Sequence, residues 1–389
     1  MQMPRMMAVA AGLIIGGAIS ANAEGVDQIN PDVAKRLYNP QMIDPAQPVG
    51  SSPLKDFKAK HAPPWKIGYA STYAGNTWRA NAMDRLQKEI IPEYKKLGLI
   101  SEVVVTQSNL NDSTQIQQMR QLVDQGVDAI ITCCSNPTAI NQTIQYAYDK
   151  GVPVFSLTGY VTAPTAINSS SNYQVAGFEI GKRMADDLGG KGNVLVVEGI
   201  PGTSTSDSQD RGIKAGLATA LGIKVVGTVA GMWTDQVAQG EVQKWLATHP
   251  GKLDGVVVQS AAEMGVLRAL QQSGRTGVKV SIGGEMGALC TWRKHPELTS
   301  SAVQAWPPGD EMSLIWDLTI RTLEGQGPKI QSVLAQPVVV THDEIMKLLP
   351  ENCDESAQNW LEVGKSRWGS EDYLKDFFYR PADPTKYKP

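Results

Sequence analysis

Polar and aromatic side chains that could hold a small ligand recur in this sequence directly after short apolar runs. The set comprises Asn76, Trp78, Arg79, Thr158, Arg211, Trp233, Ser260, Glu285 and Gln304. Amide, guanidinium and carboxylate groups form planar, bidentate hydrogen bonds to hydroxyl groups, and a tryptophan ring offers an apolar plane for stacking. These residue types therefore suit a neutral, polyhydroxylated ligand.

Sequence motifs of enzymes are missing from the same positions. No G-x-G-x-x-G follows a strand-like run, and the sequence has neither a P-loop nor a G-x-S-x-G elbow. The four histidines are dispersed and lack the spacing of metal ligands. We therefore expect no catalytic residue, no cofactor and no metal site.

Apolar runs typical of buried strands alternate with helical patterns from Trp65 onward, and Pro92 is expected to kink or break the first helix. One series of runs covers 65–71, 102–108, 127–134 and 152–158, and a second covers 193–199, 224–231, 255–260 and 278–285. Unbroken apolar strands with helical crossovers indicate parallel sheets. Two series predict two doubly wound α/β lobes, whose ligand lies at the carboxyl ends of the strands.

The N-terminal region predicts an exported protein. Residues 1–23 have a positive Arg5, a short apolar stretch and an Ala21-Asn22-Ala23 cleavage site, which is the pattern of a secretory signal peptide. Residues 24–64 are polar and contain several prolines, so we expect an extended or wrapping arm. The formal net charge is −3 and the charged residues are scattered, which excludes nucleic-acid binding.

Several stretches resemble the periplasmic sugar-binding proteins of ABC transporters, in particular the ribose-binding-like group of type I periplasmic binding proteins. They are "KIGYAS", "NTW", "VDAIITCCSNPTAI", "KGVPVFSL", "GIPGTS", "DRGIKAGL", "VVVQSAAEMGVLRAL", "SIGGE" and "AVQAWPPG", in the family's order. The resemblance implies two Rossmann-like lobes, a three-strand hinge, one ligand in the cleft and closure on binding.

The resemblance also implies domain boundaries and residue roles. Lobe 1 is expected at 65–172 and 306–335, lobe 2 at 173–305 and 336–349, and a C-terminal tail at 350–389. The residues that match ligand-binding or hinge positions of the family are Asn76, Trp78, Arg211, Trp233, Glu285 and Gln304.

Each of these assignments has a structural alternative. Trp78 and Trp233 could belong to the cores of the lobes, Arg211 could form only a salt bridge, and Glu285 could be a hydrogen-bonding group of the hinge.

Three departures from the family pattern bear on the ligand. Thr158 and Gly159 replace an Asp-Arg pair, Ser260 and Ala261 replace Asn-Asp, and Arg79 stands where a second stacking aromatic is common. We therefore expect a ligand other than ribose, with a polyol, an amino sugar or a modified sugar as candidates.

The four cysteines fall into two groups. Cys353 lies in a tail that the ribose-binding pattern lacks, and we favour a disulfide with Cys290 that staples this tail to lobe 2. Cys133 and Cys134 are neighbours at a strand end facing the cleft. Two alternatives stay open for them: two buried thiols, or a strained vicinal disulfide that offers an apolar surface to the ligand.

The expected protein is a monomeric periplasmic solute-binding protein that delivers its ligand to an ABC permease in the inner membrane and has no catalysis of its own. One alternative is a sensory module that presents the bound sugar to a chemoreceptor or sensor kinase. Another is an exported enzyme acting on sugars, which would need paired carboxylates in the cleft.

Overall fold

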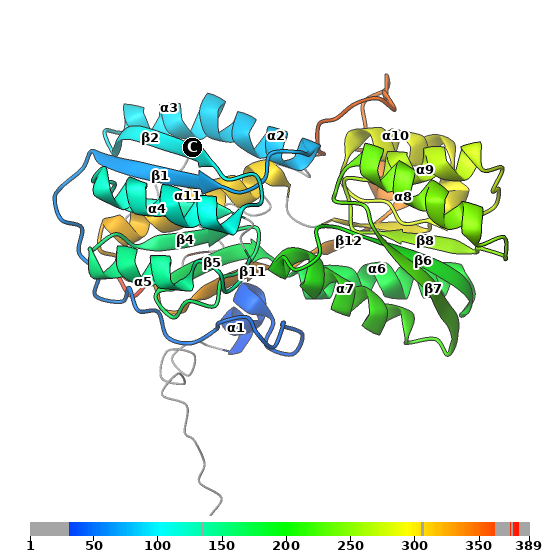
Figure 1. The fold of residues 1–389 in the computed structure, drawn as a ribbon, viewed down its shortest axis with the longest axis horizontal. Coiled ribbons are helices and arrows are strands. Elements are labelled where there is room, and N and C mark those ends of the chain that lie inside the picture. Colours follow the sequence, from blue (N-terminus) through cyan, green and yellow to red (C-terminus); the bar gives the residue numbers. More distant parts are fainter. Residues whose placement is uncertain (1–30, 134–135, 305–306, 362–373, 375, 381–389) are drawn as a thin grey trace, which may run out of the picture.

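The computed structural model describes residues 31–133, 136–304, 307–361, 374 and 376–380. Two α/β lobes lie side by side, with the first strands on the left in Figure 1. The predicted signal peptide and Cys134 lie outside the described residues. No helix within the described ranges has the length and apolar character needed to cross a membrane.

The first lobe is built on a six-stranded sheet with the order β11-β5-β4-β3-β1-β2, in which all neighbours are parallel. Its strands are β1 (Trp65–Ser71), β2 (Ile100–Gln107), β3 (Ala129–Cys133), β4 (Val154–Leu157), β5 (Ala166–Ser171) and β11 (Ser332–Ala335). The central strands β1, β3 and β4 are buried on both faces, as unbroken apolar runs predict.

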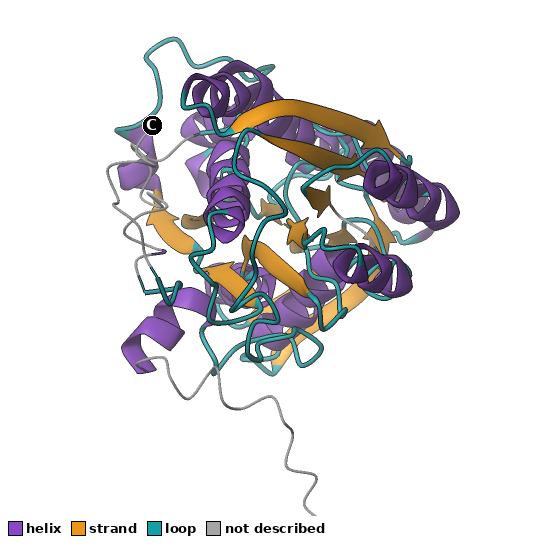
Figure 2. Ribbon diagram, turned by 90° about the vertical axis from the view of Figure 1, so that its left-hand side faces the viewer, coloured by secondary structure: helices purple, strands orange, loops and turns teal. Residues whose placement is uncertain are grey.

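Helices pack against this sheet, and Figure 2 shows helices on either side of the strands. They are α2 (Thr77–Arg85), α3 (Ile91–Lys96), α4 (Asp112–Asp124), α5 (Asn141–Asp149) and α11 (Pro308–Leu323). Pro92 does not end the helical run, because a π-helical turn at Leu86–Ile90 joins α2 to α3. A π turn changes the hydrogen-bonding register next to a residue that cannot donate an N–H.

The second lobe contains a four-stranded parallel sheet with the order β7-β6-β8-β9 and a separate antiparallel pair, β10 and β12. Its strands are β6 (Lys191–Glu198), β7 (Gly222–Ala230), β8 (Gly255–Val258), β9 (Lys279–Val280), β10 (Ser301–Gln304) and β12 (Val338–Thr341). Its helices are α6 (Tyr173–Asp187), α7 (Ser204–Leu217), α8 (Asp235–Thr248), α9 (Glu263–Gln272), α10 (Met286–Lys294) and α12 (His342–Met346), with a 3₁₀ turn at Pro296–Leu298.

Helices α6 and α7 approach each other so closely that glycine is needed on both. A Cβ atom on Gly177 would lie 2.1 Å from the Gln209 carbonyl oxygen, and one on Gly212 would lie 2.2 Å from the Gln174 carbonyl oxygen. Gly181 and Gly216 repeat this contact one turn further along. The spacing of four residues places each glycine pair on one helix face.

Upstream of the C-terminal tail, the chain crosses between the lobes three times: from β5 to α6, from β10 to α11, and from β11 to β12. Asn172 joins two of these crossings. Its side chain accepts a hydrogen bond from the Val175 N–H at the start of α6, and its backbone N–H donates to the Ala335 carbonyl at the end of β11. These three connections position the strand ends of both lobes opposite each other.

The two terminal segments pack against the lobes. The described part of the N-terminal arm, which was expected to be extended or wrapping, starts with the short helix α1 (Pro31–Tyr38), whose Leu37 and Tyr38 are buried in the first lobe. Near the other end of the chain, Phe377 and Phe378 are buried in the same core. The Cys290–Cys353 disulfide is present and fastens the start of the tail to α10.

Candidate functional site

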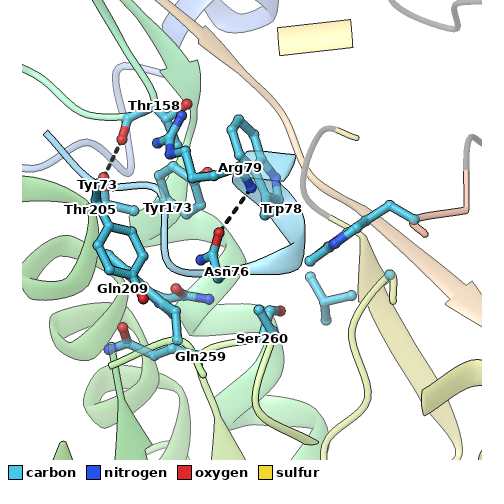
Figure 3. A pocket seen from close by; sticks show the side chains of 15 residues that line it. Tyr73, Asn76, Trp78, Arg79, Thr158, Tyr173, Thr205, Gln209, Gln259 and Ser260 are labelled. Carbon is cyan, nitrogen blue, oxygen red and sulfur yellow. Dashed lines mark hydrogen bonds between the residues drawn. The ribbon is translucent and has the colours of Figure 1, made fainter. Parts of the chain in front are cut away.

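A pocket lies between the two lobes at the carboxyl ends of their strands, with an empty volume of about 630 Å³ that includes space open to solvent. Figure 3 shows its side chains pointing inward from both lobes. The lining residues are Tyr73, Asn76, Trp78, Arg79, Thr158, Tyr173, Thr205, Gln209, Trp233, Gln259, Ser260, Ala261, Gly284, Val303 and Trp360. Six of the predicted ligand-binding residues are in this set.

The first lobe contributes the beginning of α2. The Asn76 side chain accepts a hydrogen bond from the Arg79 N–H at 2.9 Å and so caps the helix, as Figure 3 shows. Trp78 is 8% exposed and belongs to the core of the lobe while one part of it lines the pocket. The Arg79 guanidinium carbon lies 4.5 Å from the centre of the Trp78 ring. The cap thus fixes the relative positions of Asn76, Trp78 and Arg79 at the pocket.

Four lining residues have left-handed backbone conformations. They are Thr158 at φ 55°, Trp233 at φ 53°, Ser260 at φ 58° and Ala261 at φ 55°, each in the loop after a strand. Residues other than glycine adopt this conformation only where their surroundings enforce it, and such residues concentrate at functional sites.

A buried carboxylate supports the Thr158 position. Glu311 of α11 accepts hydrogen bonds from the Thr158 hydroxyl at 2.7 Å and from the Ser171 N–H and hydroxyl at 2.9 and 2.7 Å. Burial raises the pKa of Glu311, and these hydrogen bonds together with the Arg79 charge oppose that rise. The end of β4 is thereby tied to the end of β5.

Direct hydrogen bonds join the lobes around the pocket. The Tyr73 hydroxyl of the first lobe donates to the Met232 carbonyl of the second at 3.0 Å. The Thr205 hydroxyl of α7 donates to the Thr158 carbonyl, a contact drawn in Figure 3. The structure therefore holds the strand ends of the two lobes in contact across the cleft.

Two buried carboxyl groups lie at the edge of the second lobe next to the pocket. Burial and the neighbouring Glu285 charge raise the pKa of Glu263 to about 8. Burial raises the pKa of Glu285 to about 7, against a hydrogen bond from Thr77 of the first lobe that lowers it. The Glu263 oxygens accept the N–H groups of Gly283 and Ala262 at 2.9 and 3.0 Å.

We expect the stability of the protein to fall as the pH rises from about 5 to about 8, because the unfolded chain ionises Glu263 near its ordinary value of 4.5 while the folded protein keeps the proton until about 8. The stabilisation is complete below pH 4.5, declines as the pH rises because only the unfolded chain has released the proton, and is fully lost above about pH 8, where the folded protein is ionised as well. Melting temperatures between pH 5 and pH 8 should therefore decline less steeply for Glu263→Gln. Exposed Glu102→Gln is the matched control, and an unchanged slope for Glu263→Gln would contradict the prediction.

Other predicted site residues lie outside the pocket lining. The Arg211 guanidinium binds the carboxylate of Asp44 from the N-terminal arm, which is the salt-bridge alternative left open by the sequence. Glu285 is buried beside Gly284 and faces Thr77. A ligand role for either residue stays a prediction.

The remaining predictions concern strand ends. Cys133 is buried in the first core at the end of β3, where its carbonyl accepts the Thr72 hydroxyl at 2.7 Å. Its neighbour Cys134 is not among the described residues, so the state of this pair stays open. Gln304 ends β10, and its side chain also lies outside what the structure describes.

Several lining residues were not predicted from the sequence. Thr205 and Gln209 are four residues apart and therefore share one face of α7, whereas Arg211 is turned by about 200° from Gln209. This periodicity could have identified the face that meets the cleft. The other lining side chains outside the predicted ligand-binding set are Tyr73, Tyr173, Gln259, Ala261, Val303 and, from the C-terminal tail, Trp360.

Comparisons with known proteins agree with this architecture. The sequence matches the profile of the periplasmic binding protein domain over residues 67–326, more than half of the chain. The xylitol-binding protein of Mycolicibacterium smegmatis is 33% identical over 195 residues, which cover 50% of this chain and 56% of that protein. The chain thus spans just over half the length of that relative.

Two further similarities extend over more of the chain. The ribose import binding protein of Bacillus subtilis is 24% identical over 65% of this chain and 80% of its own length. The crystal structure of an ABC transporter solute binding protein from Thermobispora bispora superposes with a TM-score of 0.70 at 25% identity, covering 80% of this chain and 94% of that one. With two parallel-sheet lobes around a shared pocket and a profile match over most of both lobes, this chain belongs to the periplasmic binding protein family.

Proposed function

We propose that the protein captures a neutral monosaccharide or polyol between its lobes in the periplasm and delivers it to an ABC importer, without catalysis of its own. The chemistry of the pocket carries this proposal. Its described lining combines three tryptophans with amide and hydroxyl side chains and has no carboxylate or histidine. The tryptophans can stack on the apolar ring face of a sugar, and the amide and hydroxyl side chains can form hydrogen bonds with its hydroxyl groups.

Two further observations support a neutral ligand. Arg79 is the one cation in the described lining, so an ammonium group would find a like charge and no carboxylate there. This favours sugars and polyols over amino sugars. The relatives named above are described as binding xylitol and as importing ribose, which favours transport over the sensory alternative.

The test is a thermal-shift panel of pentoses, hexoses, polyols and amino sugars on protein that has been unfolded, dialysed and refolded. A ligand at about a hundred times its Kd should stabilise the protein by about 2.7 kcal/mol. A hit among neutral sugars or polyols would support the proposal. Chemical conversion of the hit compound, followed by chromatography, would overturn the non-enzymatic part.

Trp78→Ala should weaken the affinity for the best panel compound by about 2 kcal/mol, or roughly thirtyfold in Kd, because a stacking plane is lost. Isothermal titration calorimetry gives the Kd. Trp245→Phe is the control, since Trp245 of α8 stacks on His249 just beyond the helix end and is not part of the pocket lining. Equal affinities of Trp78→Ala and the wild type would place the ligand elsewhere.

A further inference from the structure

The C-terminal tail forms one wall of the pocket, and we refer to residues 353–361 as the tail strap. The strap is fastened to the second lobe by the Cys290–Cys353 disulfide. Three backbone hydrogen bonds extend this attachment along the start of α10: Gly287 N–H to the Ala357 carbonyl at 3.0 Å, Met286 N–H to Asn359 at 2.9 Å, and Leu361 N–H to Gly284 at 2.9 Å.

These bonds attach the strap to the first turn of α10. The first N–H groups of a helix have no partner within it, and here carbonyl groups of the strap accept two of them. Gly287 permits the close approach, because a Cβ atom at this position would lie 2.6 Å from the Glu355 carbonyl oxygen. The strap therefore moves with the second lobe.

The strap also reaches the first lobe, at the helix that carries the capping Asn76. The Trp360 indole N–H donates to the Thr77 hydroxyl at 3.2 Å, and the Asn81 amide donates to the Gln358 carbonyl at 3.0 Å. In Figure 1 this part of the chain, in orange, passes above the gap between α10 and α2. Opening the lobes on this side requires both hydrogen bonds to break.

We propose that Trp360 is a ligand-contacting residue supplied by the tail strap, and that the Cys290–Cys353 disulfide positions it there. This inference rests on the proposed function, since it concerns the same pocket. The Trp360 side chain is half-buried, lines the cavity and is held at both ends, by the Thr77 hydroxyl and by the backbone pairing of Trp360 with Glu285. A ligand in the pocket therefore meets an indole from each lobe and a third from the strap.

The strap should act mainly on ligand release. A rigid aromatic wall costs little conformational entropy to order, and loss of such a contact is usually expressed in the dissociation rate. Trp360→Ala should weaken the affinity for the best panel compound about tenfold, chiefly through faster dissociation. Trp360→Phe keeps the ring and loses the bond to Thr77, and should stay within about threefold of the wild type.

The experiment uses the full chain and stopped-flow tryptophan fluorescence, with Gln358→Ala as the matched control in the same strap. The Gln358 side chain is exposed, and its backbone carbonyl still accepts the Asn81 bond after the substitution. Melting temperatures of the free proteins report any loss of folding separately. Wild-type affinity and dissociation rate in Trp360→Ala would overturn the inference.

The role of the disulfide is tested by a double-mutant cycle. Replacing both Cys290 and Cys353 by serine should weaken binding in the wild-type background and add nothing in the Trp360→Ala background. Additive effects would overturn the positioning role of the disulfide. If no panel compound stabilises the wild type, the proposed function fails and the inference with it. If Trp78→Ala loses affinity and Trp360→Ala does not, only the inference fails.

Discussion

Gly212→Ala is expected to lower the free energy of unfolding of the second lobe by about 3 kcal/mol, because the new methyl group has no space and meets backbone atoms. The Gln174 carbonyl oxygen would lie 2.2 Å from it and the Phe178 nitrogen 2.7 Å. Neither atom can rotate away as a side chain would. The helices α6 and α7 must therefore separate, and their shared core with β6 loses contacts.

Guanidinium unfolding followed by circular dichroism measures this effect. Gly240→Ala in α8 is the matched control, since a Cβ atom there would have no neighbour within 4 Å. Its expected change has the opposite sign, a gain of about 0.5–1 kcal/mol from the higher helix propensity of alanine. Two substitutions with the same sign and size would show that close packing of α6 and α7 does not limit stability.

Asp44→Ala should cost about 3 kcal/mol, because several polar partners lose one buried acceptor. The Asp44 carboxylate accepts the Tyr160 hydroxyl of the first lobe at 2.8 Å and also binds Ser208 and Arg211 on α7 of the second. The Arg211 side chain is 46% exposed, so its ion pair is screened by solvent and most of the loss falls on the two hydroxyl groups.

Thermal unfolding with Asp44→Asn as a companion separates hydrogen bonding from charge. Asparagine still offers a hydrogen-bond acceptor, so Asp44→Asn should lose less than half of the stability that Asp44→Ala loses. Asp56→Ala is the control, because Asp56 is exposed and pairs with Arg380 only at 3.7 Å. A loss for Asp44→Ala no larger than for Asp56→Ala would mean that the arm does not hold the lobes together.

The general architecture was predictable from the sequence because the central strands are buried on both faces and so read as apolar runs. The strand β5 was not recognised. Its sequence "AINSSS" is polar, and tertiary contacts satisfy those side chains. Asn168, for example, accepts the Val161 N–H at 2.9 Å, and the Ser171 hydroxyl donates to Glu311. Local patterns do not contain such partners.

Part of the site was predictable for a similar reason. Residues that follow strands, such as Asn76, Trp78 and Trp233, reach the cleft because parallel strands end at one edge of a sheet. The environment of Arg211 depends on its ion pair with Asp44. The position of Trp360 at the cleft depends on the disulfide that fastens the tail to the second lobe. Both contacts join segments far apart in the chain, which no spacing rule specifies.

The strand order of the first lobe has a consequence for the assembly of the newly made chain. β11 pairs with β5, yet it is synthesised after the whole sheet of the second lobe. Until β11 emerges, β5 has an open edge of unpaired backbone groups, which is a template for pairing with another chain. A chain cut short before Ser332 would keep this edge permanently. Aggregation of truncated products is therefore a vulnerability that this topology builds in.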